Sequence, residues 1–213
     1  MDRGPAYRID TERLVLRCYS VDDHAAVSAG IVANLEHLRS SMPWVTGEPL
    51  SVDERVARLR QFRGAFDLGQ DFPYGIFDRE GAFIGSAGLH PRIGPGAIEI
   101  GYWIDRGHEG RGLVTEAAGA LTRVAIELHG VERVEIRCDP ENARSAAVAR
   151  RLGYTHDATL RRRARRPDGA ERGTMIWSLF ADELGSSPAV RIAYEARDAV
   201  GRRIDAEQRS GHP

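Results

Sequence analysis

Residues 97–117 restrict the possible folds more than any other part of this sequence. The segment reads AIEIGYWIDRGHEGRGLVTEA, which joins an alternating strand pattern, a glycine-bearing loop and the start of a helix. Gly107, Gly110 and Gly112 allow backbone amides to approach a ligand without a Cβ atom in the way. With the helix N-terminus after Leu113 they predict a phosphate or pyrophosphate site, although such glycines also form plain tight turns. The spacing is neither that of a Walker loop nor G-x-G-x-x-G.

The order of the other elements predicts a mixed α/β, or α+β, layer architecture. Helical spacing of apolar residues predicts helices that begin at Asp22, at Ser51, at Thr115 and after Asn142. Ser51 and Glu54 have the spacing of a capping box. Because strand and helix do not alternate from the start of the chain, a dinucleotide-binding fold is excluded. The expected strands span 13–18, 74–77, 83–89, 97–104, 131–138, 158–165 and 174–180.

The composition is that of a globular chain of 213 residues, enough for one domain with an extension. Its 30 basic and 31 acidic side chains leave a net charge of −1. This excludes a nucleic-acid binder that depends on bulk positive charge. All 30 basic residues are arginine, so no lysine is present to act as a nucleophile or to form a Schiff base.

The expected location is the cytoplasm, and no metal site is expected. No run approaches about 18 consecutive apolar residues, and the first ten residues lack the apolar core of a signal peptide. Cys18 and Cys138 lie in separate strand-like runs and are expected to be reduced, buried thiols. The seven histidines show no paired ligand spacing.

Two motifs resemble those of the GNAT N-acetyltransferase superfamily. Gly110-Arg111-Gly112 is similar to the acyl-coenzyme A loop R/Q-x-x-G-x-G/A, with Gly107 in place of the first Arg or Gln. The fuller run from Glu99, and the stretch 142–154 with its N-x-x-S-x-x-V-x-x-x-L-G-Y pattern, look like the RimJ/RimL branch, the ribosomal-protein-alanine acetyltransferases. The resemblance covers residues 10–184. It implies the GNAT fold, a mostly antiparallel sheet of about seven strands flanked by about four helices.

Residues 185–213 are expected to form a C-terminal extension. Ile192, Ala196, Ala199, Val200 and Ile204 have helical spacing, which predicts a weakly amphipathic surface helix with a disordered end. The alternative is a packing element for a partner subunit, and a homodimer stays open.

The resemblance implies acetyl-coenzyme A, or another acyl-coenzyme A, as co-substrate. It implies that strand 99–104 splays from strand 133–138, that the pantetheine arm enters this V, and that the pyrophosphate lies on the amides of 109–114. Asn142 could bond pantetheine or simply cap its helix, and Thr115 could be a plain helix-start residue. The expected cofactor-binding residues are Trp103, Ile104, Glu109, Gly110, Arg111, Gly112, Leu113, Val114, Thr115, Asn142 and Ser145.

The implied reaction is direct attack of an amine on a thioester in a ternary complex. Glu99 is the candidate general base, because it shares its strand face with Gly101 and Trp103 beside the loop, and its neighbours there are expected to be apolar. The alternative is a surface-facing glutamate. The resemblance implies Ser145 as the acid that protonates the thiolate, with Tyr154 as a rival or a core aromatic. The amide of Ile104 would polarise the carbonyl.

The acceptor is expected to be a primary amine, either a protein N-terminus or a small molecule. Its pocket should include Trp44 (or Trp44 is a core residue), the second helix and the final hairpin. Five arginines in 161–166 suggest a solvated hairpin, or a contact with the coenzyme's 3′-phosphate, an acidic protein or RNA. Other functions stay open: a different acyl donor such as succinyl-coenzyme A, or a non-catalytic acyl-coenzyme A sensor or interaction module.

Overall fold

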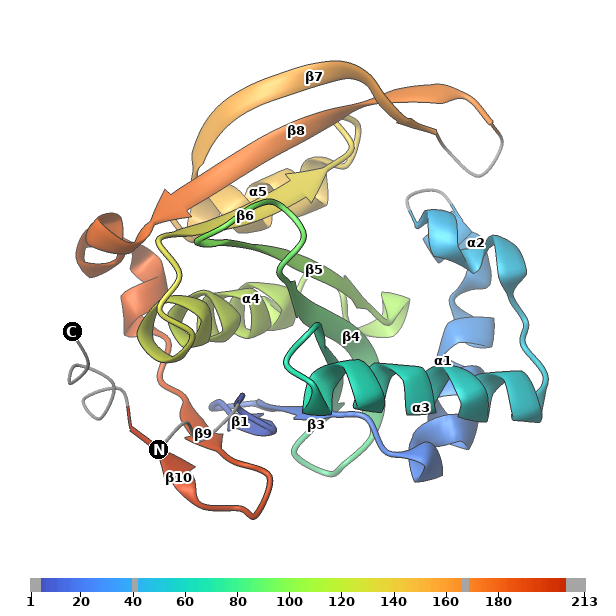
Figure 1. The fold of residues 1–213 in the computed structure, drawn as a ribbon. Helices are drawn as coiled ribbons and strands as arrows, with labels where there is room; N and C mark the ends of the chain where they lie inside the picture. The colour runs from blue at the N-terminus through green and yellow to red at the C-terminus, as the bar shows by residue number, and fades with distance from the viewer. Residues whose placement is uncertain (1–4, 40–41, 166–168, 206–213) are drawn as a thin grey trace.

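A computed structural model describes residues 5–39, 42–165 and 169–205, and its centre is one ten-stranded sheet (Figure 1). The strand order is β10-β9-β1-β2-β3-β4-β5-β6-β8-β7, and every pairing except β5 with β6 is antiparallel. The strands are β1 (Arg8–Asp10), β2 (Leu14–Cys18), β3 (Phe72–Asp78), β4 (Phe83–His90), β5 (Ala97–Ile104), β6 (Arg133–Cys138), β7 (Thr155–Arg165), β8 (Glu171–Phe180), β9 (Glu195–Arg197) and β10 (Arg203–Ile204).

Helices pack on both faces of the sheet. They are α1 (His24–Ala33), α2 (Leu35–Arg39), α3 (Val52–Asp67), α4 (Leu113–Arg123, continued by a π-helical turn over Val124–Leu128) and α5 (Ala143–Arg151). The Ser51 capping box at the start of α3 is confirmed, since Ser51 accepts from the Glu54 amide and the Glu54 side chain accepts from the Ser51 amide. Helix α4 begins two residues earlier than its apolar pattern predicts, directly after Gly112.

The alternation of side chains along β5 divides the core in two. Ile98, Ile100 and Ile104 belong to the main cluster, which also holds the buried residues of α4 and α5. Trp103 points to the opposite face and joins a smaller cluster with residues of α1 and α3, such as Ile31 and Leu59. Both faces of β5 are therefore covered, each by a different set of helices.

Strands β5 and β6 stay together over a short distance only. Their parallel pairing joins Ala97–Ile100 to Arg133–Ile136, four residue pairs. Beyond Ile100, β5 keeps its antiparallel partner β4 as far as Ile104, whereas β6 continues beside β8. The backbone of 101–104 therefore borders an opening between the two strands, at the point where the GNAT resemblance implies a V.

The prediction of a C-terminal helix is wrong for the described residues. Between 185 and 205 the chain forms a 3₁₀ turn over Pro188–Arg191 and the strands β9 and β10, and β9 pairs with β1. These two strands and β1 account for the difference between ten strands and the expected seven. Ala196 and Ile204 are buried on the sheet, and Asp198 accepts the Val200 and Arg202 amides in the turn between them. The apparent helical period therefore arises from two short strands and a turn, and the division at residue 184 stays a prediction.

Two further expectations concern membranes and metals. Within the described ranges, no helix is long and apolar enough to cross a membrane. The same ranges bring no three His, Cys, Asp or Glu side chains together in a way that could hold a metal ion. Cys18 and Cys138 are both free thiols, the former half-buried and the latter buried.

Replacing Leu121 tests the packing of α4 on the sheet. Leu121 is fully buried, so Leu121→Ala should lower the free energy of unfolding by about 2–5 kcal/mol, measured by urea denaturation. Leu68→Ala is the matched control, because that leucine is 72% exposed and should change stability by less than about 0.5 kcal/mol. Equal losses in the two variants would contradict the described position of α4.

Candidate active site

The loop between β5 and α4 leaves backbone amides free to face a ligand. Gly110 and Gly112 have φ of 72° and 77°, a left-handed conformation that suits glycine. Gly112 is the N-cap of α4 and has no side chain to bond the first helical turn. The amides at the start of α4, at the positive end of the helix dipole, are therefore available for an anion. This geometry fits a pyrophosphate group.

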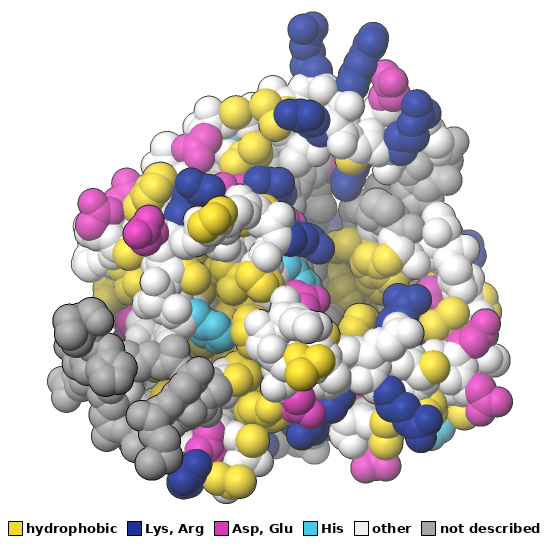
Figure 2. Space-filling model, viewed as in Figure 1, with side chains coloured by type: hydrophobic (Ala, Val, Ile, Leu, Met, Phe, Trp, Pro, Cys, Tyr) yellow, Lys and Arg dark blue, Asp and Glu magenta, His cyan; other side chains and the backbone are white. Residues whose placement is uncertain are grey.

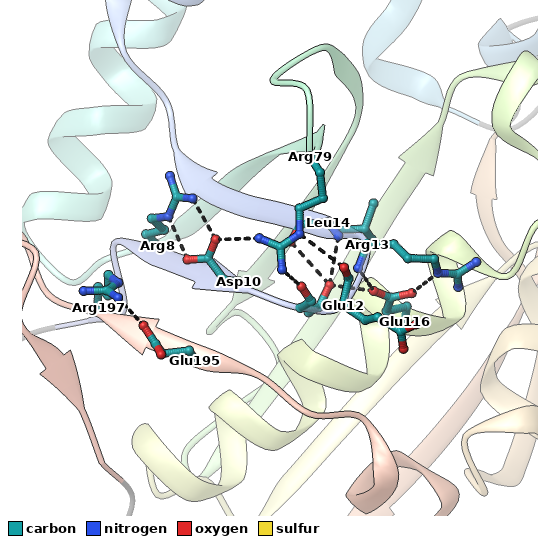
Figure 3. Close-up of polar contacts among 10 residues, drawn as sticks. Arg8, Asp10, Glu12, Arg13, Leu14, Arg79, Glu116, Glu195 and Arg197 are labelled. Atoms are coloured by element: carbon teal, nitrogen blue, oxygen red, sulfur yellow. Dashed lines mark hydrogen bonds and ion pairs between the residues drawn. The ribbon is translucent and has the colours of Figure 1, made fainter.

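A buried carboxylate fixes the start of α4 to the start of β2. Glu116 accepts hydrogen bonds from Thr11 Oγ1 (2.7 Å), from the Arg13 amide (2.9 Å) and from Arg13 Nε (2.6 Å). Arg13 Nη1 also donates to the carbonyl of Arg111 at 2.9 Å. Figure 3 shows Arg13 and Glu116 facing each other between the strand and the helix. Sequence analysis missed these contacts, because nothing local pairs Glu116 with residues a hundred positions away.

Asn34, between α1 and α2, holds the other side of the loop. Its Nδ2 donates to Asp105 Oδ2 at 2.6 Å, and its Oδ1 accepts from the Arg106 amide at 2.9 Å. The hydrogen bond from Asn34 is the main cause that holds the pKa of the Asp105 carboxyl below its usual range. The loop is thus tied at both ends to elements that come early in the chain.

The predicted loop residues take different positions. Glu109 forms ion pairs with His37 Nε2 (3.1 Å) and Arg144 Nη1 (2.6 Å), so its side chain links α2 to α5. The Arg111 side chain is exposed, and Thr115 is half-buried in the first turn of α4. Their amides, rather than their side chains, lie where an anion would bind.

Ser145 and Tyr102 meet at the opening between β5 and β6. The two hydroxyl groups lie 3.0 Å apart, and Asn142 Oδ1 accepts the Ser145 amide at 3.0 Å, which confirms Asn142 as the cap of α5. Burial raises the pKa of both the Tyr102 phenol and the Cys138 thiol, and a hydrogen bond with Ser145 opposes the shift in each. Tyr102 is a site residue that sequence analysis did not single out.

Tyr154 contacts α4 through its hydroxyl group. It is buried, and its hydroxyl oxygen is 2.7 Å from Thr122 Oγ1 on α4. Burial raises the pKa of this phenol. These contacts are those of the core aromatic that sequence analysis considered as the alternative to an acid.

Glu99 is buried on the opposite face of β5, but its surroundings are not apolar as expected. Arg92 donates to both of its oxygens, from Nη2 at 2.7 Å and from Nε at 3.1 Å. The expectation failed because Arg92 lies in the turn before β5, where strand alternation says nothing about side-chain direction. Each carboxylate oxygen thus accepts one charge-assisted hydrogen bond from the same guanidinium.

His90 lies beside Glu99 on the same face and was missed by sequence analysis. Its Nδ1 is 2.6 Å from Asp71 Oδ1. Because a carboxylate only accepts, this contact assigns a proton to Nδ1, so that in the neutral imidazole Nε2 is the nitrogen with the free lone pair. A Cβ at Gly88 would lie 2.6 Å from Nε2 and one at Gly101 3.3 Å from it, so two glycines make room for the ring. Nε2 therefore lies over Gly101, the first residue of β5 beyond the β6 pairing.

The same face carries an aromatic wall and a cavity. Trp44 is 41% exposed and its ring centroid lies 6.4 Å from that of Trp103, which in turn contacts Phe83. This exposure fits a pocket wall better than a core position. A cavity of about 490 Å³ opens nearby, and Glu99 and Cys138 are among its lining residues.

Comparison with known proteins agrees with this geometry. The family model described as "Acetyltransferase (GNAT) domain" matches residues 13–155, about two thirds of the chain. The chain belongs to the GNAT acetyltransferase family. The match runs from β2 to the start of β7 and so includes the α4 loop and the opening between β5 and β6.

Individual GNAT relatives are more distant. The probable N-acetyltransferase YjcK of Bacillus subtilis (strain 168) is 26% identical over 116 residues, which are 53% of this chain and 64% of YjcK. The [ribosomal protein uS5]-alanine N-acetyltransferase of Escherichia coli (strain K12) is 28% identical over 159 residues, 70% of this chain and 79% of that protein. The chain spans between about a third and two thirds of the first curated relatives it matches. RimJ of Mycobacterium smegmatis, solved with a coenzyme A disulfide, has a TM-score of 0.73 and 26% identity, covering 88% of this chain and 91% of RimJ.

Removing the Glu116 carboxylate should loosen the loop. Glu116→Ala leaves Thr11 and Arg13 without their shared partner, and we expect a loss of about 2–3 kcal/mol in unfolding free energy. Glu12→Ala is the control, because the Glu12 side chain is exposed and Glu12 stands between Thr11 and Arg13 in the sequence. Thermal and urea unfolding measure both variants, and a Glu116→Ala protein as stable as Glu12→Ala would contradict the anchoring role.

Proposed function

We propose that this protein transfers an acetyl group from acetyl-coenzyme A to a primary amine by direct attack in a ternary complex. The observation that carries the proposal is the uncapped start of α4, placed at the end of the opening between β5 and β6. The relatives support it: one is named for acetylating the alanine of ribosomal protein uS5, and another was solved with a coenzyme A disulfide. The acceptor is a protein N-terminus or a small amine.

The donor would lie along the unpaired edge of β5. The amides of 109–115 receive the pyrophosphate, and the free backbone of 101–104 hydrogen-bonds the pantetheine arm. The amide of Ile104 polarises the thioester carbonyl, and Trp103 closes the opposite face. Asn142 caps α5 through its oxygen, which leaves its NH₂ group to donate to a pantetheine carbonyl.

We propose His90 as the general base. The amine attacks the thioester carbon, forming the C–N bond and breaking the C–S bond, and His90 Nε2 takes the proton that the amine loses. Asp71 orients the ring through Nδ1. Glu99 stays a second candidate for this role, although both of its oxygens bind the Arg92 guanidinium, which makes the carboxylate a weaker base.

Ser145 is proposed to return a proton to the leaving thiolate, which gives free coenzyme A. Its hydroxyl lies within hydrogen-bond distance of the Tyr102 phenol, which can hand on a proton in turn. Both groups border the opening from the α4 and α5 face, whereas His90 lies on the opposite face. Acid and base thus act on opposite sides of the reacting carbonyl.

Thermal unfolding with acyl-coenzyme A esters tests donor binding. At 100 times the dissociation constant a ligand adds about 2.7 kcal/mol, which for this chain length raises the melting temperature by about 5–10 °C. Acetyl-coenzyme A should produce this shift, and acetyl-pantetheine, which lacks the pyrophosphate, much less. A larger shift with succinyl-coenzyme A would change the donor, and no shift with any ester would contradict the α4 site.

Turnover measured by thiol release tests the base. His90→Gln should lower kcat/KM about 100-fold or more with the dissociation constant for acetyl-coenzyme A unchanged, and Asp71→Asn should lower it about tenfold. His24→Gln, at the start of α1, is the control. A loss confined to Glu99→Gln would assign the base to Glu99 instead. Firm donor binding without thiol release from any amine would favour the non-catalytic sensor.

A further inference from the structure

Three arginines line the cavity on the face of the sheet that carries Glu99 and His90. Arg137, Arg163 and Arg172 line it, together with Glu99, Cys138 and apolar or hydroxyl side chains of β7 and β8. The lining residues come from β5 to β8, not from the loop 109–115, so the cavity is separate from the pyrophosphate site. Figure 2 shows arginine side chains gathered over the β7–β8 hairpin and a hollow beneath it.

A large bulge in β7 brings Arg163 to the cavity. Leu160 pairs with Thr174 and Ala164 with Arg172, so three residues of β7 stand opposite the single residue Gly173. Within the bulge Arg162 has φ of 56°, a left-handed conformation that is unfavourable for arginine. Bulges beside active sites redirect side chains, and strained residues gather there. Within the described chain no ion pair with Arg163 is found, whereas Arg162 pairs with Glu171.

Arg172 presents a mostly buried guanidinium to the same cavity. Its side chain is 16% exposed, and its Nη1 lies 3.5 Å from Asp139 Oδ2. Its Nε is buried, and no group of the described residues accepts from it. A buried guanidinium donor without an acceptor costs free energy, so Arg172 is not fully satisfied by the described residues.

The acidic groups of this region do not neutralise the cavity. Glu99 is matched by Arg92, and Glu135 serves both Arg133 and Arg137. Asp139 is matched with Arg172. Three carboxylates thus face five guanidinium groups, when Arg163 is included. Two positive charges remain in excess beside the proposed acceptor site.

We infer that this cavity is an acceptor subsite for an anionic group, so that the preferred acceptor carries a carboxylate or phosphate close to its reactive amine. Arg163 and Arg172 would donate to that group in charge-assisted hydrogen bonds. The inference rests on the proposed function, because it assigns the specificity of the same acceptor site. The anionic group belongs either to an acidic peptide N-terminus or to a small amine.

Binding distinguishes the two sources without requiring turnover. Fluorescence anisotropy in the presence of coenzyme A compares peptides that begin Ala-Glu-Glu and Ala-Gln-Gln. Competition by phosphoethanolamine and by ethanolamine compares a small anionic amine with a neutral one. We expect the anionic member of at least one pair to bind about tenfold more tightly, and the preferred pair identifies the source.

Variants assign the preference to the cavity. Arg163→Gln should reduce it to about twofold or less, and Arg163→Glu should reverse it toward a peptide that begins Ala-Arg-Arg. Arg161→Gln is the matched control, because Arg161 is an exposed arginine of β7 outside the lining and should keep the preference. Arg163 is exposed, so its replacement leaves the fold intact.

Equal binding of charged and neutral ligands by the native protein would overturn the inference, as would a preference that Arg161→Gln removes as fully as Arg163→Gln. Single-stranded RNA bound through Arg163 without discrimination between the peptides would overturn it too. A retained preference with no thiol release would contradict the proposed acetyl transfer and leave the subsite supported.

Discussion

The short parallel pairing of β5 and β6 is the constraint on which the rest of the structure depends. Parallel neighbours need a crossover, and α4 supplies it. After Ile136, β6 keeps its hydrogen bonds with β8 and leaves β5, so the strands separate while both stay paired on their outer sides. The free edge of β5 then needs acceptors and donors, and an extended amide-bearing ligand can provide them. The start of α4 lies beside this edge because the loop from β5 is short.

That loop is rich in glycine, and its shape comes from contacts made by the rest of the chain. Glycine loses more conformational freedom on folding than other residues, so a glycine loop alone would fluctuate. Glu116 ties the loop's helical end to β2 through Thr11 and Arg13, and Asn34 ties its other end to the α1–α2 junction. The N-terminal third of the chain therefore orders the loop before α4, where we propose that the pyrophosphate binds.

Local patterns predicted the local features. Strand alternation, the Ser51 capping box and the Asn142 cap follow from neighbouring residues. The direction of a turn residue and the pairing of side chains across neighbouring strands carry no periodic signal, which is why the Arg92 pair on Glu99 and the His90–Asp71 pair were missed. The prediction for the tail failed for a related reason: Ala196 and Ile204 are spaced like a helix face, yet Ala196 lies on β9, which pairs with β1, and Ile204 lies on β10, which pairs with β9.

The positive charge of the cavity would affect both the reactivity and the binding of an amine acceptor. Positive charge near the acceptor disfavours its ammonium form and so favours the neutral amine, the form with a lone pair for attack. The same charge would weaken binding of a plain amine, which an anionic group elsewhere on the acceptor offsets. Gly88 and Gly101 make room for the His90 ring on the face of β5 that carries Glu99, one of the residues that line the cavity. An amine anchored by its anionic group would then meet the imidazole before it reaches the thioester.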